Sequence, residues 1–469
     1  MFPLKSAFIS PHSDGSAIAM KFRLCPKLPW TPLFTIIGDL TRQRAKDIVS
    51  FLITVIGITV ISGVCYMTLC QAHPIFAYEG NVNTGGITSA SIGRFTFKAK
   101  AETPSKAEIE QSEYYRWKTH TDLKYKGQLI SRPAQGVIHV KVTKWINNRP
   151  VRINVVEINK KANSKLEIKP KTAGTMYLNN KASIRTIAQT ENSIVAINGG
   201  YFKPQTGVPL GTLVIDKNVL TGPIYNRVAL GINPDNSYSM DKSKINITIN
   251  SRKTEIKADN INQPRMLSTY TLVYTDKWGK ITPPAPKYGM AIAVKDGEIL
   301  NFGYGSVEIP KGGFAVVGPK QNIEPLLGDI KIKMNIKFTE SFENSEHIIG
   351  GGPYLVKNGQ MFVDIAEQKF GAINGKNPRT AIGYTETNEL IIVTVDGREE
   401  ASVGMTLWEI SRLMKDLGCI YAMNLDGGGS SVIYVKGKIE NNPAYKEGIA
   451  ISNAIVVNEN IDIQTVASN

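Results

Sequence analysis

Near the end of the chain, a strand–helix–strand pattern sharply limits the available folds. The apolar run 390–395 is typical of a buried strand, and Thr406 with Glu409 three residues later predicts a capped helix start. Apolar residues then recur at helical spacing until Gly418, where a glycine is expected to end the helix. A second apolar run, 419–425, follows at once. Two strands joined by such a crossover are expected to run parallel, so this segment predicts an α/β sheet.

Polar residues follow both of these strands. Asp396 comes directly after the first strand and Asp426 after the second, so both carboxylates are expected at one edge of the sheet, where α/β proteins bind ligands. Asn198 follows the short strand 193–197 and would extend this edge if its strand joins in the same direction. The residues Gly427, Gly428, Gly429, Ser430 and Ser431 come next; their backbone N–H groups and hydroxyls suit sugar or phosphate oxygens. The alternative is a tight glycine turn capped by an aspartate.

Short strand patterns run through much of the remaining sequence. Two alternating runs, 137–142 and 152–158, are separated by an Asn-Asn-Arg-Pro sequence that predicts a hairpin turn. Further short β patterns punctuated by glycine and proline lie between residues 210 and 329. We therefore expect one large, strand-rich domain of the mixed α/β (α+β) class over residues 137–458, followed by a tail at 459–469.

The N-terminal part differs in composition. Residues 1–47 are predicted to form a basic, disordered tail, and the uncharged run 48–70 is long enough at ~1.5 Å per residue to cross a hydrocarbon core of about 30 Å. Basic residues before this run predict a cytoplasmic N-terminus, and therefore a membrane anchor with the domain outside the cytoplasm. Alternatively, the run is a signal peptide cut after Ala72 or Ala77, which would make the protein secreted. Residues 71–136 are polar and predict a linker or stalk.

Net charge and cysteine content limit the classes of binding partner and metal that we expect for this chain. The net charge of +15 favours an acidic polymer, an anionic membrane surface or a phosphate-bearing substrate. No zinc-finger or helix-turn-helix pattern accompanies the scattered basic residues, so nucleic acid is not expected as a partner. Only Cys419 lies beyond the apolar run, which excludes a disulfide within the outer part of the chain, and no His/Cys cluster suggests zinc.

Two further motifs point to an anionic ligand. The stretch 349–359 contains a run of three glycines that includes Gly352, and the stretch 377–383 presents Arg379 ahead of a strand. Arg398 lies close behind Asp396. Arginine binds phosphate bidentately, and a pair of carboxylates can supply the acid, base or nucleophile of glycosyl transfer. Structural salt bridging is the alternative role for the two arginines.

With these motifs in hand, the chain resembles the phosphodiester glycosidase family, whose best-known member removes N-acetylglucosamine from a phosphodiester. The resemblance covers roughly Val137–Asn458. Its motifs are, in order, Asn198–Phe202, Gly350–Gly359, Asn377–Gly383, Val395–Arg398, Gly404–Leu407 and Asn424–Ser431. It implies a single mixed α/β domain with its site built from these loops, and a substrate that is a sugar 1-phosphodiester or a phosphate-bearing glycan of the cell envelope, such as an exopolysaccharide.

Under this resemblance the site residues take the following expected roles. Asp426 is the essential carboxylate and Asp396 the second one, while Arg379 and Arg398 hold the phosphate. Sugar or phosphate oxygens are expected to contact the remaining set, which is Asn424, Gly427, Gly428, Gly429, Ser430, Ser431, Asn198, Gly199 and Gly352. The sequence departs from the family at Ile449 and Asn377, where relatives often carry arginine and histidine respectively.

Two alternatives remain beside this hypothesis. No cofactor is required, but Asp396, Asp426 and Asn198 are oxygen ligands that suit Ca²⁺ or Mg²⁺, which would make the protein a metal-assisted phosphodiesterase. The other alternative is a non-catalytic glycan-binding module tethered to the envelope. The loss of the arginine at Ile449 favours that module, whereas Asp426 and both arginines favour the enzyme.

Overall fold

The computed structural model describes residues 104–264 and 267–460, whose elements belong to one compact unit. The predicted basic tail 1–47, the predicted anchor 48–70, the first half of the predicted linker and the end of the predicted C-terminal tail lie outside these residues. Within the described ranges, no helix is both long and apolar enough to span a membrane.

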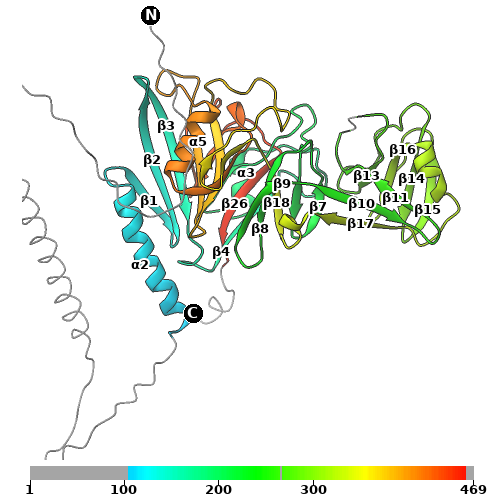
Figure 1. Ribbon diagram of the computed structural model, residues 1–469, viewed down its shortest axis with the longest axis horizontal. Coiled ribbons are helices and arrows are strands. Elements are labelled where there is room, and N and C mark those ends of the chain that lie inside the picture. Colours follow the sequence, from blue (N-terminus) through cyan, green and yellow to red (C-terminus); the bar gives the residue numbers. More distant parts are fainter. Residues whose placement is uncertain (1–103, 265–266, 461–469) are drawn as a thin grey trace, which may run out of the picture. The chain divides into compact units, whose positions relative to one another are not determined.

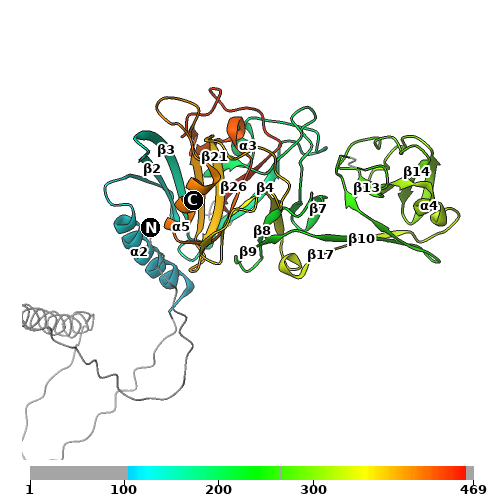
Figure 2. The same cartoon turned by 45° about the horizontal axis from the view of Figure 1, so that its top comes forward.

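An eight-stranded sheet forms the largest layer of the fold (Figures 1 and 2). Its strand order is β1-β2-β3-β22-β21-β23-β19-β20, and every neighbouring pair is antiparallel. The strands are β1 (Leu129–Ala134), β2 (Val137–Ile146), β3 (Arg149–Ile158), β19 (Tyr354–Lys357), β20 (Gln360–Met361), β21 (Arg379–Thr385), β22 (Leu390–Val395) and β23 (Cys419–Asn424). The hairpin predicted between the first two alternating runs joins β2 to β3, with Asn147 and Asn148 both at positive φ.

The two strands of the strand–helix–strand segment run parallel, as predicted, but another strand lies between them in the sheet. Strands β22 and β23 are each antiparallel to β21, which lies between them, so they run parallel to each other without pairing. The connecting helix α5 (Leu407–Asp416) begins with the predicted capping box of Thr406 and Glu409. Asp396 and Asp426 therefore follow strands that end at the same edge of the sheet. The strand that carries Asn198 belongs to another sheet. Asn198 therefore does not extend the edge formed by the ends of β22 and β23, which was expected only if its strand joined the same sheet.

Two helices, α2 (Lys106–Lys124) and α5, pack on one face of this sheet. Helix α2 is held by the buried Glu157 of β3, whose carboxylate accepts hydrogen bonds from Trp117 Nε1 (3.0 Å), Tyr125 Oη (2.9 Å) and Lys124 Nζ (2.7 Å). This differs from the predicted linker 71–136, because residues from 106 onward form a helix and a strand on the sheet. Little in the sequence indicated that this helix packs on the sheet, because α2 is largely polar and only Trp117 and Thr121 are buried on it.

Two five-stranded sheets complete the body of the fold. The second sheet has the order β25-β24-β5-β26-β4, with helix α3 (Ile184–Thr190) packed on it, and the third has the order β7-β6-β18-β8-β9. The strands of the second are β4 (Leu166–Thr172), β5 (Val195–Asn198), β24 (Ile433–Val435), β25 (Lys438–Ile439) and β26 (Asn453–Glu459). The strands of the third are β6 (Leu213–Ile215), β7 (Asn218–Thr221), β8 (Val228–Ile232), β9 (Tyr238–Lys242) and β18 (His347–Gly350).

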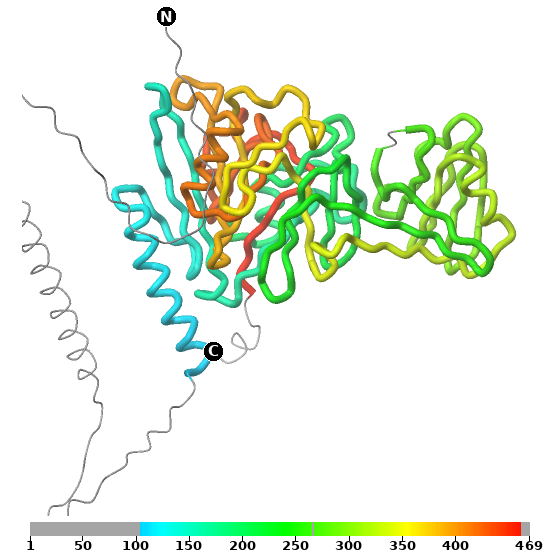
Figure 3. The backbone as a smooth tube through the Cα atoms, viewed as in Figure 1, coloured from blue at the N-terminus to red at the C-terminus, as the bar shows by residue number. Residues whose placement is uncertain are grey.

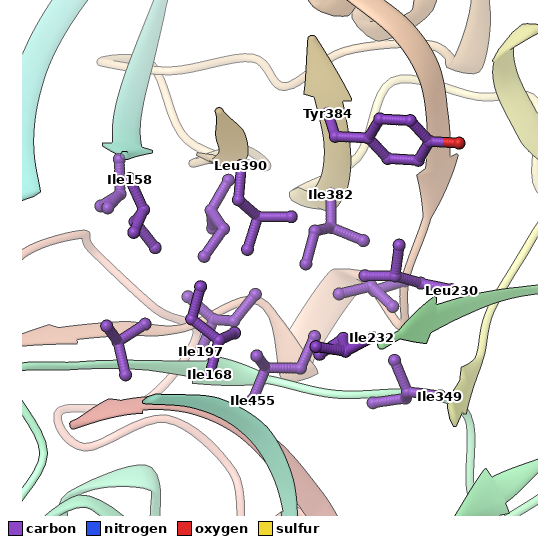
Figure 4. Packing of buried hydrophobic residues seen from close by; sticks show 14 of the residues in the cluster. Ile158, Ile168, Ile197, Leu230, Ile232, Ile349, Ile382, Tyr384, Leu390 and Ile455 are labelled. Atoms are coloured by element: carbon purple, nitrogen blue, oxygen red, sulfur yellow. The ribbon is translucent and has the colours of Figure 1, made fainter. Parts of the chain in front are cut away.

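The main hydrophobic core lies where these three sheets meet (Figure 4). Ile158, Ile382 and Leu390 come from the first sheet, and their side chains point toward those of the second and third. The second sheet contributes Ile168, Ile197 and Ile455, and the third contributes Leu230, Ile232 and Ile349. β-branched residues dominate because they pack well on pleated surfaces. This shared core fixes the relative positions of the strand ends that carry the candidate site.

Between β9 and β18 the chain builds two further sheets with their own hydrophobic clusters, and Figure 3 follows it through them. One has the order β11-β10-β17 and the other β12-β13-β16-β14-β15. Their strands are β10 (Ile245–Asn250), β11 (Glu255–Ala258), β12 (Asn260–Ile261), β13 (Leu272–Thr275), β14 (Gly289–Lys295), β15 (Glu298–Gly303), β16 (Phe314–Pro319) and β17 (Lys333–Phe338). The short helices of the chain are α4 (Lys320–Ile323), η1 (Glu324–Leu326), η2 (Glu340–Phe342) and η3 (Gly428–Ser430). The described elements thus form a strand-rich, mixed α+β fold.

Candidate active site

Backbone hydrogen bonds tie four chain segments together around Asp426. The Asp426 N–H donates to Gly199 O (3.2 Å), and the Gly428 N–H donates to Pro378 O (2.9 Å). The Gly352 N–H donates to Asn424 O (2.7 Å). The loop after β23 is therefore joined to the ends of β5 and β18 and to the start of β21. Segments that carry four of the sequence motifs are brought to one place by these contacts.

The Asp426 carboxylate is half-buried and held by its own loop. Its Oδ1 accepts the Gly427 N–H (2.9 Å) and its Oδ2 accepts the Ser430 hydroxyl (2.7 Å). Burial raises the pKa of Asp426 to about 6, an effect that the two hydrogen bonds only partly offset. A carboxylate that titrates near neutrality is suited to general acid–base or nucleophilic chemistry. The catalytic role of Asp426 stays a prediction at this point.

The glycines after Asp426 allow close approach of other groups. Gly428 has a φ of +62°, and a Cβ there would lie 3.0 Å from Arg398 Nη2. A Cβ on Gly429 would lie 3.7 Å from Ile449 Cγ2. Gly428, Gly429 and Ser430 form the 3₁₀ turn η3, which explains the tight path of the loop. Ser430 supports Asp426, whereas Ser431 is buried and its Oγ has no hydrogen-bond partner in the described part of the chain.

Tyr201, Asn424 and Gly352 form a hydrogen-bonded group beside this loop. The Tyr201 hydroxyl donates to Gly352 O (2.8 Å) and accepts from Asn424 Nδ2 (2.9 Å). Burial raises the pKa of the Tyr201 phenol, and the negative charge of Asp426 raises it further. Asn424 Oδ1 is buried without a partner among the described residues, which leaves one acceptor of this group unused. Tyr201 was not among the predicted site residues, although the quoted motif Asn198–Phe202 contains it.

Asn198 and Gly199 have structural contacts. Asn198 Nδ2 donates to Asp426 O (2.8 Å), while its Oδ1 accepts from Thr380 Oγ1 (2.7 Å) and from the Val432 N–H (3.2 Å). A Cβ on Gly199 would lie 2.1 Å from Asn453 Oδ1, so only glycine fits there. The two residues therefore hold the Asp426 loop in place, and the side chain of Asn198 has no oxygen left for a ligand.

Arg379 lies near the site, but most of its donors are already used. The side chain is buried, with Nε donating to Met405 O (3.0 Å) and Nη2 donating to Ile373 O (2.6 Å) and Gly375 O (2.7 Å). Within the described residues, Nη1 makes no hydrogen bond. Burial lowers the pKa of Arg379, and the nearby Arg398 lowers it further. Arg379 thus secures the 373–375 loop, and its predicted role as a phosphate clamp rests on Nη1 alone.

Arg398 is exposed and adjacent to the glycine loop. Its Nε (3.1 Å) and Nη2 (2.9 Å) both donate to Asn377 Oδ1. Its φ of +66° is unusual for a residue with a side chain, and it places the guanidinium beside Gly428. Asn377 therefore supports Arg398. This arrangement brings one predicted arginine next to the predicted loop.

Asp396 faces a different environment from Asp426. Its buried Oδ1 accepts from Asn441 Nδ2 (3.1 Å) and from the Asn442 N–H (3.0 Å), and burial raises its pKa. Arg152 and Glu399 are the charged groups that shift this pKa, and Asp426 is not among them. Asp396 also lines a cavity of about 510 Å³ together with Lys141 and Arg152. Asn441 Nδ2 also donates to Ser431 O (3.1 Å), so one asparagine joins Asp396 to the end of the glycine loop.

Ile449, one of the two positions at which the sequence departs from the family pattern, lies beside the glycine loop. Its Cγ2 and Cδ1 lie against Gly429, so an apolar side chain borders the glycine loop. Lys446, three residues before Ile449, is exposed and acts electrostatically on Glu447. The described residues at this border therefore contain no cation in contact with Gly429.

The oxygen ligands suggested for Ca²⁺ or Mg²⁺ are not gathered in the described structure. Asn198 Oδ1 already accepts two hydrogen bonds, and Asp396 Oδ1 accepts hydrogen bonds from Asn441 and Asn442. These three residues therefore do not fit a shared ion. Asp216, Glu346 and His347 do lie close together, but His347 Nδ1 accepts the Asp216 N–H, and none of the predicted site residues belongs to this group.

Taken together, the site presents one titrating carboxylate, a glycine loop bordered by a guanidinium and an amide–phenol group on a strand-rich α+β fold. Residues 271–458, less than half of the chain, match the sequence model of the family described as phosphodiester glycosidase. The predicted resemblance to this family is confirmed over residues 271–458 of the range 137–458 for which it was expected.

Individual relatives match over short stretches. The SPbeta prophage-derived uncharacterized protein YomE of Bacillus subtilis is 49% identical over 70 residues, which is 15% of this chain and 11% of that protein. The mouse N-acetylglucosamine-1-phosphodiester alpha-N-acetylglucosaminidase is 28% identical over 108 residues, or 21% of each chain. This chain thus spans about a fifth or less of the length of these relatives.

Solved structures support the fold. A hypothetical protein from Synechocystis superposes with a TM-score of 0.63 at 22% identity, covering 69% of this chain and 62% of that chain. At this identity the likeness establishes the fold alone.

Proposed function

We propose that the chain hydrolyses, or transfers, a sugar at the anomeric carbon of a sugar 1-phosphodiester, with Asp426 as the essential carboxylate. The observation that carries this proposal is the half-buried Asp426 carboxylate, whose pKa is raised to about 6 where four motif segments meet. The family match and the adjacent Arg398 support a phosphate-bearing sugar as the substrate class.

The proposed chemistry needs little from the protein on the leaving-group side. The bond between C1 and the phosphate oxygen breaks, the phosphomonoester leaves with the bonding electrons, and water bonds to C1. The proton of water passes to the Asp426 carboxylate or to solvent. Because phosphate is a good leaving group, a general acid is not essential, and the main task is stabilising positive charge at C1. An ionised Asp426 supplies that stabilisation.

Asp426 carries the chemistry alone in this proposal. The predicted second carboxylate, Asp396, accepts hydrogen bonds from Asn441 and Asn442, and it is joined to the end of the Asp426 loop through Asn441, which also donates to Ser431 O. Its catalytic role stays a prediction. Asn424 and the 427–429 backbone are proposed to contact sugar or phosphate oxygens.

The biological setting is also a proposal. The name of the mouse relative suggests N-acetylglucosamine as the first sugar to test. The apolar run 48–70 would anchor the chain with its domain outside the cytoplasm, and the net charge of +15 suits an anionic envelope glycan or exopolysaccharide.

The test uses the full chain and two substrates with the same sugar. One is α-N-acetylglucosamine 1-(alkyl phosphate) and the other is an aryl α-N-acetylglucosaminide, each incubated with the parent and with Asp426→Asn. The proposal is supported if the parent releases sugar from the phosphodiester and Asp426→Asn does so at least a hundredfold more slowly. Equal rates in variant and parent would contradict the role of Asp426, and loss of activity with a chelator would favour the metal-assisted alternative.

One observation favours a second candidate, a non-catalytic glycan-binding module. Ile449 borders Gly429. The family resemblance predicts an arginine at this position, so an apolar side chain takes the place of an expected phosphate contact. Binding of the phosphodiester to the full chain without any turnover would support this module.

A further inference from the structure

Arg227 is an arginine at the candidate site whose charge is not paired with any described residue. It immediately precedes β8, and its guanidinium carbon lies 3.9 Å from the ring centroid of Phe370. The corresponding distances are 5.2 Å to Tyr201 and 5.6 Å to Tyr225. We call these three rings the aromatic collar. Stacking against aromatic faces restricts the orientation of the guanidinium plane.

The guanidinium has donors to spare. Throughout the described residues, its nitrogens make no hydrogen bond and no ion pair, and Nε is buried without a partner. The terminal Nη1 and Nη2 are not enclosed in this way and reach the surface. A half-buried cation without an anion is costly, since burial removes hydration that no partner replaces. An anionic ligand would provide the missing partner, and a fork of N–H donors matches phosphate oxygens.

The collar connects Arg227 to the Asp426 loop. The Tyr201 hydroxyl donates to Gly352 O and accepts from Asn424, which lies two residues before Asp426. Asp426 and Arg227 are both close enough to Tyr201 to act on its phenol electrostatically. Gly352 is part of the same contact, because a Cβ there would lie 3.0 Å from Phe370 Cε2. The unpaired cation and the reactive carboxylate therefore border the same group of residues.

We propose that Arg227 binds the phosphodiester anion of the substrate while the sugar faces Asp426. This inference rests on the proposed function and names the group that recognises the phosphate. It differs from the roles predicted from the sequence, because three hydrogen bonds of Arg379 go to backbone carbonyls and Arg398 is bonded to Asn377. Arg227 has its terminal donors free among the described residues.

The first test compares two leaving groups. Arg227→Met keeps a long apolar chain inside the aromatic collar and removes the charge, and Arg252→Met removes an exposed charge elsewhere as the matched control. Charge-assisted hydrogen bonds are strong enough for kcat/KM on α-N-acetylglucosamine 1-(alkyl phosphate) to fall by about 10- to 100-fold in Arg227→Met. The loss on the aryl glycoside should be at least tenfold smaller, and Arg252→Met should match the parent. Equal losses on both substrates, or no loss, would overturn the proposal.

A second variant covers the case in which Arg227→Met fails to fold. Arg227→Lys keeps the charge but offers a point contact instead of a fork. We expect it to lose about 3- to 10-fold on the phosphodiester and less on the aryl glycoside. Unchanged selectivity between the two substrates would count against Arg227.

A binding measurement separates this inference from the proposed function. Dimethyl phosphate is titrated calorimetrically into the full-chain parent, Arg227→Met and Arg252→Met, and the measurement requires no turnover. If the parent cleaves neither substrate, the proposed function fails, but dimethyl phosphate should still bind at least tenfold more weakly to Arg227→Met than to the other two proteins. Equal binding by all three, or no binding by the parent, would overturn the phosphate role.

Discussion

Asp426→Asn should make the protein more stable at neutral pH while removing its activity. The reason is that the folded protein holds a carboxyl whose pKa is raised from 3.8 to about 6 by burial. A shift of ~2 units corresponds to about 3 kcal/mol of unfolding free energy lost to the cost of burying the charge. An amide carries no charge at any pH, so the variant avoids this cost.

The pH dependence has a definite sign. Below about pH 3, Asp426 is protonated in both the folded and the unfolded chain, so parent and variant should differ little. As the pH rises through about 6, the unfolded chain ionises more readily than the folded one, and the parent alone loses this stability. The advantage of the variant should therefore grow from ~0 near pH 3 to about 1–3 kcal/mol at pH 7.5. The lower value allows for hydrogen bonds that the amide makes less well.

The assay is urea unfolding of the full chain at both pH values. The hydrogen bonds need not be lost, because the amide oxygen can accept the Gly427 N–H and the amide nitrogen can donate to Ser430 Oγ. Asp235→Asn is the matched control, since Asp235 is exposed and hydrogen bonds from Ser237 lower its pKa. It should not stabilise the protein at pH 7.5. A destabilised Asp426→Asn, or an advantage that does not grow with pH, would refute the reasoning.

Four further outcomes are expected. The pH profile of kcat/KM should fall on the acid side with an apparent pKa near 6, since Asp426 must be ionised; a flat profile between pH 5 and 7 would contradict this. Gly199→Ala should destabilise the chain by about 2–4 kcal/mol in denaturant unfolding, because its Cβ would lie 2.1 Å from Asn453 Oδ1, and a normal midpoint would show that the contact can relax. Glu157→Ala should cost about 3 kcal/mol and expose α2 to limited proteolysis, since two buried donors and one half-buried ammonium lose their acceptor; unchanged cleavage would refute the anchoring role. Thr406→Ala should cost about 1 kcal/mol by thermal unfolding through loss of the α5 cap, whereas Thr406→Ser should not.

Local patterns in the sequence were sufficient for the elements around Asp426. The capping box, the apolar stripe and Gly418 define α5, and the flanking apolar runs define β22 and β23. Their parallel direction was also predictable from the length of the connection. The insertion of β21 between them was not, because strand pairing depends on long-range contacts that no local pattern encodes.

The roles of individual side chains were harder to predict. Asp396 follows a strand at the expected edge, yet its carboxylate accepts hydrogen bonds from residues 441 and 442, which are distant in sequence. Arg379 binds carbonyls whose positions depend on loop geometry. Arg227 stands in no motif, and only the tertiary structure places the aromatic collar around it. Motifs therefore locate the site, while packing decides which of its charges remain available.

The central claim is that Asp426 supports cleavage of the bond between the anomeric carbon and the phosphate oxygen. Its most direct test is hydrolysis of α-N-acetylglucosamine 1-(alkyl phosphate) by the full chain in water enriched in ¹⁸O, followed by mass spectrometry of both products. Glycosidic cleavage places the heavy oxygen on the sugar and leaves the phosphomonoester unlabelled, and Asp426→Asn should form neither product. Label in the phosphate would show attack at phosphorus and contradict the account.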